Sequence, residues 1–144
     1  MNLFSQKIHS NGFHLIEIII VVAIISILSA ISVPIYTQYT THARRAEAVS
    51  ALMELSIALE HFHLEHNTYE EASLLVLNFP EDIADHHYRL IIQTTTSHEY
   101  ALHAEPRGKQ AENDAICGTL ILDSNNRKNI TGTGNIHECW QSLL

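Results

Sequence analysis

The chain has 144 residues, and its 8 lysines and arginines stand against 16 aspartates and glutamates, a formal net charge of −8. This length allows one domain with one modest core. The acidic balance repels phosphate backbones, so composition argues against direct nucleic-acid binding. The sequence contains no glycine-rich phosphate loop, nucleophile elbow, HExxH motif or candidate catalytic pair. We therefore expect a protein that is not an enzyme and uses no cofactor.

The chain begins with a short polar leader, residues 1–12, and continues into a long apolar run. Residues 15–35 read LIEIIIVVAIISILSAISVPI, in which Glu17 is the only ionisable side chain. At about 1.5 Å per residue, a helix of this length spans roughly 30 Å, enough to cross the hydrocarbon core of a bilayer. A secretory signal peptide is cleaved after its apolar region. Here the candidate site, Gly12-Phe13, precedes the apolar run, so cleavage would leave the helix on the mature protein.

The segment from Gly12 to Glu17, together with the apolar run, resembles the prepilin signature of type IV pilins. That family has glycine before the cleaved bond, phenylalanine after it and glutamate five residues into the mature chain. Pro34 falls where similar pilins carry a helix-bending proline, whereas His14 departs from the usual threonine at the second mature position. The resemblance implies that a prepilin peptidase removes the leader and N-methylates Phe13.

Glu17 needs a physical explanation whatever the family. A carboxylate in a membrane helix costs about 2.5–3.5 kcal/mol at the bilayer centre and less near an interface. A cation would make it tolerable, and cleavage creates one in the new amine of Phe13. The spacing in the chain allows a contact within one helix, whereas the resemblance implies pairing with the Phe13 amine of a neighbouring subunit during assembly. The alternative is a carboxylate near the headgroups without a partner.

The positions of the basic residues disagree with this topology. Arg44 and Arg45 follow the apolar run, whereas only Lys7 precedes it. A count of positive charges alone would place the carboxyl-terminal domain in the cytoplasm. Because the count is small and the signature is specific, we expect residues 13–36 to cross the inner membrane. Residues 37–144 would then form a domain that is periplasmic before assembly and extracellular in the pilus.

The helical pattern continues beyond the apolar run to about His66, because residues 42–66 contain neither glycine nor proline. Pro34 lacks an amide hydrogen and predicts a kink. Two apolar stripes follow at helical spacing: Val49, Leu52, Met53, Ser56 and Leu59 form one, and Ala51, Leu55, Ala58 and Phe62 form the other. Either one stripe packs on its own domain and the second meets neighbouring subunits, or the helix is buried deeply in its own domain.

The second half of the chain has the composition of strands. Strand-like runs cover Tyr88–Thr95, His98–Ala104 and Ile116–Leu122, with a last short strand at His137–Trp140. Short turns at Thr96-Ser97 and around Gly108 favour antiparallel pairing. The predicted fold class is therefore α+β. A long N-terminal helix, transmembrane in its first half and amphipathic in its second, packs on a small antiparallel sheet, as the pilin resemblance also implies.

Two cysteines, Cys117 and Cys139, bracket a loop rich in asparagine, glycine and threonine. In a cytosolic protein they would be free thiols, but in an exported domain a disulfide is the better interpretation. Such a bond would add about 3 kcal/mol on the chain-entropy model. The CGTL run from Cys117 and the terminal Cys139-Trp140 pair also resemble the disulfide-closed region of pilins, and more narrowly that of type IVa minor pilins.

Eleven histidines invite a metal hypothesis. His61, His63 and His66 lie near a helix end with Glu65, and His86-His87 are adjacent. Only His63 and His66 have a spacing that suits two ligands on one helix face. Solvated histidines on an acidic surface are the simpler interpretation, so we expect no metal site.

Together these features predict a structural subunit, a minor pilin that polymerises through its N-terminal helix. It would support pilus assembly, adhesion, twitching motility or DNA uptake. Expected partners are other pilin subunits, prepilin peptidase, the inner-membrane assembly machinery and, before assembly, membrane lipid, with no direct nucleic-acid binding. One alternative is a type II secretion pseudopilin, although those typically lack the disulfide. The other is a single-pass envelope protein with a ligand-binding domain.

Overall fold

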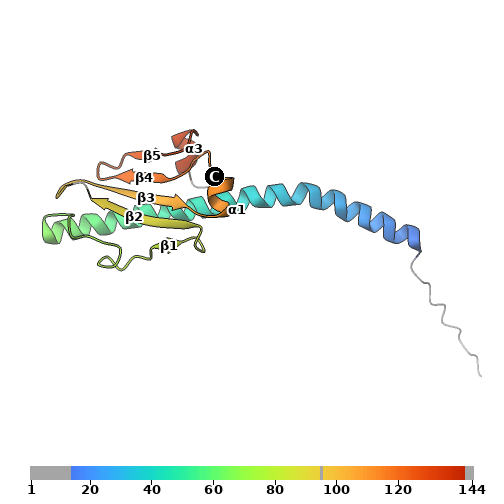
Figure 1. The fold of residues 1–144 in the computed structure, drawn as a ribbon, viewed down its shortest axis with the longest axis horizontal. Coiled ribbons are helices and arrows are strands. Elements are labelled where there is room, and N and C mark those ends of the chain that lie inside the picture. Colours follow the sequence, from blue (N-terminus) through green and yellow to red (C-terminus); the bar gives the residue numbers. More distant parts are fainter. Residues whose placement is uncertain (1–13, 95, 142–144) are drawn as a thin grey trace, which may run out of the picture. The chain divides into compact units, whose positions relative to one another are not determined.

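The computed structural model describes residues 14–94 and 96–141. The chain divides into two units, one up to Tyr36 and one from Thr37 onward, and each is described by itself. Helix α1 (Leu15–His66) begins in the first unit and ends in the second. The second unit also contains a five-stranded sheet and two short helices, α2 (Lys109–Asn113) and α3 (Ile136–Trp140) (Figure 1).

In the first unit, α1 is apolar and its side chains from Leu15 to Tyr36 are exposed. The helix is long and apolar enough to cross a membrane, judged by length and composition. The Ser26 hydroxyl donates to the Val22 carbonyl oxygen at 2.7 Å, so this polar group is satisfied inside the helix. Pro34 lies within α1, and the kink expected there stays a prediction.

The sheet of the second unit has its strands side by side in chain order, and every neighbouring pair is antiparallel (Figure 1). The strands are β1 (Asp82–Ile83), β2 (Tyr88–Thr94), β3 (Tyr100–Pro106), β4 (Leu120–Asp123) and β5 (Lys128–Ile130). Alternate residues of β3 are buried, so Tyr100, Leu102 and Ala104 face the core. This alternation fixes the register, because a slip of one residue would expose them.

The second part of α1 covers the inner face of the sheet with a single buried stripe. Ala48, Leu52, Leu55, Leu59 and Phe62 recur every three or four residues and join the sheet residues in one hydrophobic core. This stripe takes members from both predicted stripes. The other residues of those stripes are mostly half-buried, and whether they meet neighbouring subunits stays a prediction.

The helix ends as predicted at His66. Asn67 follows in the left-handed region with φ 60°, and its amide donates to the His63 carbonyl oxygen at 2.8 Å. The fold class is confirmed: a long apolar N-terminal helix packs on an antiparallel sheet in a pilin-like α+β fold. The disulfide between Cys117 and Cys139 is also confirmed, with a Cα–Cα distance of 5.6 Å.

Two details of the carboxyl-terminal region differ from the prediction. The strand expected from Ile116 begins only at Leu120, because the chain turns at Gly118, where φ is +62°. The last predicted strand, His137–Trp140, is wrong, since these residues belong to helix α3. The Asn135 side chain caps that helix by accepting a hydrogen bond from the His137 amide at 2.9 Å.

Candidate functional site

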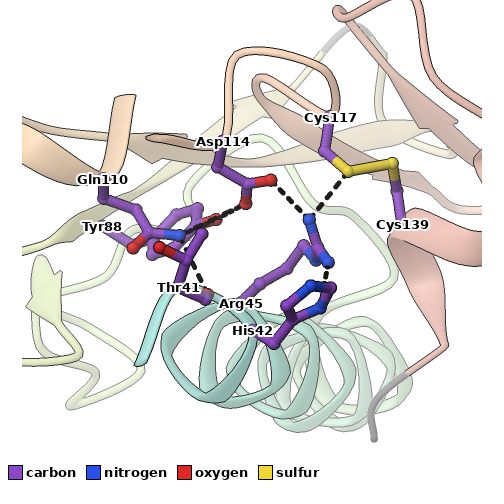
Figure 2. A network of polar contacts seen from close by, with 8 residues as sticks. All are labelled: Thr41, His42, Arg45, Tyr88, Gln110, Asp114, Cys117 and Cys139. Atoms are coloured by element: carbon purple, nitrogen blue, oxygen red, sulfur yellow. Dashed lines mark hydrogen bonds and ion pairs between the residues drawn. A yellow bond between two sulfur atoms is a disulfide. The ribbon is translucent and has the colours of Figure 1, made fainter. Parts of the chain in front are cut away.

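A buried polar network ties α1 to the segment around α2 (Figure 2). Arg45 is only 6% exposed and forms an ion pair with Asp114, which follows α2. The Tyr88 hydroxyl donates to Asp114 Oδ2 at 2.9 Å. The Gln110 side-chain amide donates to the Thr41 carbonyl oxygen at 3.1 Å and lies 3.2 Å from both the Tyr88 hydroxyl and Asp114 Oδ2.

This network holds its charges in place. Burial, together with the nearby Asp114 carboxylate, raises the pKa of Tyr88, so its hydroxyl stays protonated and remains a donor. A buried ion pair adds little net stability, but removing one partner leaves an uncompensated charge and is strongly destabilising. The network therefore fixes the segment that leads from α2 into the disulfide. From the sequence, Arg45 was considered only as a positive charge after the apolar run, and this role was missed.

Arg45 also reaches the disulfide and lines a cavity. Figure 2 shows its guanidinium between Asp114, Cys117 and His42. Nη1 lies 2.9 Å from Cys117 Sγ, and Nη2 donates to His42 Nδ1 at 2.7 Å. These groups line a cavity of about 470 Å³ bounded by α1, the segment after α2, and α3.

The remaining cations divide into paired and unpaired groups. Arg89 pairs with Glu81, and Arg127 pairs with Asp123. Among the described residues, four other cations have no carboxylate within ion-pair distance: Arg44, Arg107, Lys109 and Lys128. Local positive charge is therefore present on this acidic domain at a few defined places.

The turn between β4 and β5, residues 124–128, has a fixed shape and polar side chains. Asp123 Oδ1 accepts hydrogen bonds from the amides of Asn125 and Arg127, both at 2.9 Å, and Oδ2 accepts one from Arg127 Nε at 2.7 Å. Burial acts to raise the pKa of Asp123, but these hydrogen bonds outweigh it and lower the pKa, so the carboxylate stays ionised. The Ser124 amide donates to the Tyr100 carbonyl oxygen at 3.0 Å, which anchors the turn to β3.

Lys128 is held beside α3. Its Nζ lies 5.4 Å from the centre of the Trp140 ring, and Trp140 Nε1 donates to the Asn129 carbonyl oxygen at 3.0 Å. A second cavity of about 470 Å³ lies between β5 and α3, lined in part by Lys128, His137 and Gln141. Together with the exposed side chains of the turn, this edge of the sheet presents cations, amides and an imidazole.

These side chains have the chemistry of nucleic-acid contacts. Arginine and lysine bind phosphate oxygens and the major-groove edge of guanine, whereas asparagine pairs with the edge of adenine. The run from Ser124 to Lys128 reads SNNRK and offers both kinds of group on one rigid turn. The turn therefore carries the types of side chain that contact DNA, even though the whole chain is acidic.

The other residues singled out in the sequence lie apart from this turn. Gly12 and Phe13 lie outside the described residues, and Glu17 lies in the first turn of α1. His63 stacks on Tyr69, and His66 stacks on Phe62. In the part of the chain that the structure describes, no cluster of three metal-ligating side chains occurs.

Comparison with known proteins identifies the family. Residues 34–121, more than half of the chain, match the family described as type IV minor pilin ComP, DNA uptake sequence receptor. No curated protein matches the chain.

The predictions of a minor pilin and of a structural, non-enzymatic protein are confirmed, and DNA uptake is supported among the processes considered. The prediction that excluded direct nucleic-acid binding is wrong, because the family is a receptor for DNA. The chain belongs to the type IV minor pilins of the ComP family and takes part in DNA uptake.

Proposed function

We propose that this minor pilin binds duplex DNA directly through the turn at residues 124–128 and so captures DNA for uptake. The observation that supports this most is the fixed turn itself, in which Asn125, Asn126, Arg127 and Lys128 are all exposed. Because Asp123 already orders the turn, little conformational entropy is lost when DNA binds.

A second pair of cationic side chains, Arg107 and Lys109, lies at the opposite end of the sheet. Arg107 and Lys109 follow β3, whereas the turn at residues 124–128 is anchored to the start of β3. They lie within the residues that match the family, and the turn lies outside them. Arg107 and Lys109 supply charge for phosphates but flank Gly108 rather than amide side chains. We therefore favour the turn for reading bases and use the second pair as the matched control.

The experiment compares two double variants that remove the same charge. Arg127→Gln with Lys128→Gln should weaken binding to a mixture of duplex fragments by at least about 30-fold, since two contacts worth roughly 1–3 kcal/mol each are lost. The slope of log affinity against log salt should fall by about 2. Arg107→Gln with Lys109→Gln should have a clearly smaller effect. Equal losses from the two variants, measured by fluorescence anisotropy, would contradict the assignment.

We further propose the processing and location that the amino terminus favours. A prepilin peptidase removes residues 1–12, leaving Phe13 as an N-methylated first residue. Residues 13–36 then cross the inner membrane, with the domain from 37 to 144 in the periplasm before assembly and on the pilus surface afterwards. The exposed apolar part of α1 supports this, because such a surface needs lipid or neighbouring subunits to cover it. Other pilins and the inner-membrane assembly machinery are the expected partners.

A further inference from the structure

The two sulfur atoms of the disulfide have different electrostatic surroundings. Arg45 Nη1 lies 2.9 Å from Cys117 Sγ, and this guanidinium is almost fully buried. Within the described residues, no cation makes the equivalent contact with Cys139 Sγ. Glu138 precedes Cys139 and lines the same cavity. The positive charge therefore lies beside Cys117, whereas the carboxylate of Glu138 belongs to the residue next to Cys139 in the chain.

We propose that this asymmetry gives the disulfide a chemical direction. An external thiolate attacks Cys139 Sγ and forms a mixed disulfide with it. The bond between the two cysteines breaks, and its electron pair leaves with Cys117 as a thiolate beside Arg45. When the bond forms by the reverse path, the Cys117 thiolate attacks Cys139 in a mixed disulfide and expels the external thiolate. The partner is a small thiol or a protein that exchanges thiols with disulfides.

The direction follows from the stability of the leaving group. A cation beside a cysteine favours its thiolate, and the more stable thiolate leaves faster in exchange. Asp114 also contacts Arg45 and opposes this effect. Arg45 is nevertheless the charged group in direct contact with Cys117 Sγ. Glu138 acts in the same direction, because a nearby negative charge disfavours a thiolate at Cys139.

The geometry also gives a small thiol access to the attacked sulfur. Cys117 and Cys139 both line the cavity of about 470 Å³, although each is at most 4% exposed. Glutathione, a flexible tripeptide thiol, is therefore a suitable probe.

The test uses the full-length oxidised protein and limiting glutathione. The reaction is quenched with acid, the freed thiol is alkylated, and peptide mapping locates both modifications in the species that carries one of each. Glutathione should be found on Cys139 and the alkyl group on Cys117, with at least about a threefold excess over the opposite pattern. An equal distribution, or an excess of glutathione on Cys117, would overturn the proposal.

Variants of Arg45 and Glu138 then test whether these charges, rather than access to the sulfur atoms, decide which cysteine glutathione attacks. Arg45→Gln should abolish the excess, and Arg45→Lys should retain part of it because the positive charge is kept. Since Arg45→Gln also strands Asp114 and can unfold the domain, Glu138→Gln at the exposed end of the cavity is the second variant. It should reduce the excess of glutathione on Cys139 without affecting the fold. An excess unchanged in Glu138→Gln, or identical in a folded Arg45→Gln, would show that charge does not set the direction.

Discussion

At the scale of single residues, the buried tyrosines make the stability of the domain depend on pH. Tyr88 donates to Asp114, and Tyr100 donates to Glu60 at 3.1 Å. Burial raises the pKa of both hydroxyls, and the neighbouring carboxylates raise it further. In an unfolded chain tyrosine ionises near pH 10. The folded state therefore holds these protons more tightly, so the stabilisation is complete below about pH 10 and is lost as the pH rises above it.

We accordingly expect alkaline unfolding. Above about pH 10, tyrosine ionisation at 295 nm should accompany the loss of near-ultraviolet circular dichroism. Tyr88→Phe should lose less stability between pH 9 and 11 than the unmodified chain, although it should cost about 1–3 kcal/mol at neutral pH because Asp114 loses a donor. Tyr39→Phe, at a residue 63% exposed, is the control and should change neither value. Normal ionisation of both buried tyrosines near pH 10 in a folded chain would contradict this expectation.

At the scale of elements, periodic and local signals were predictable, whereas contacts distant in sequence were not. The apolar run and the absence of glycine and proline before His66 predict α1, because a helix depends on residues close in sequence. The buried role of Arg45 was missed, since its partner Asp114 lies 69 residues away and leaves no local pattern. The strand predicted at His137–Trp140 failed for another reason: the capping side chain of Asn135 and the disulfide favour a short helix over a fifth pairing.

The carboxyl-terminal elements provide a stability prediction of their own. The disulfide closes a loop with a sequence separation of 22, which contains β4, the turn at residues 124–128 and β5. Cys139→Ser should lower the free energy of unfolding by about 3 kcal/mol. Trp140, the only tryptophan, adjoins the lost bond and should report the loosening through its fluorescence. The double variant Cys117→Ser with Cys139→Ser controls for the remaining free thiol, and a loss well below 1 kcal/mol in urea titrations of both would contradict the prediction.

At the scale of the whole molecule, the net charge led to the wrong expectation about DNA binding, because it is an average over the whole chain. A formal charge of −8 opposes DNA at long range, yet salt screens that repulsion within about 10 Å. Binding then depends on the few groups that touch the phosphates and bases. Arg127 and Lys128 adjoin two asparagines on one turn, while most carboxylates lie elsewhere in the chain. The composition therefore constrains how fast DNA approaches more than whether it binds.

We propose that this chain assembles into a filament, and Glu17 is where we expect assembly to be most sensitive. Glu17 lies in the first turn of an apolar helix. If its carboxylate meets the Phe13 amine of another subunit, Glu17→Ala should leave the domain and its disulfide intact. Membrane insertion should be no worse, because an apolar side chain replaces a costly carboxylate. Assembly should nevertheless fail or slow, since the buried amine of the neighbour loses its counter-charge.

Glu17→Asp is the matched variant, because it keeps the charge but shortens the reach, and it too should assemble poorly. Cleavage, membrane level and incorporation into sheared filaments are followed separately for each variant. Normal incorporation of Glu17→Ala would show that the carboxylate does not act in assembly. Loss of cleavage would instead assign Glu17 to recognition by the peptidase, and the proposed pairing would then be unsupported. Retained cleavage and membrane level with lost incorporation is the combination that only a contact between subunits explains.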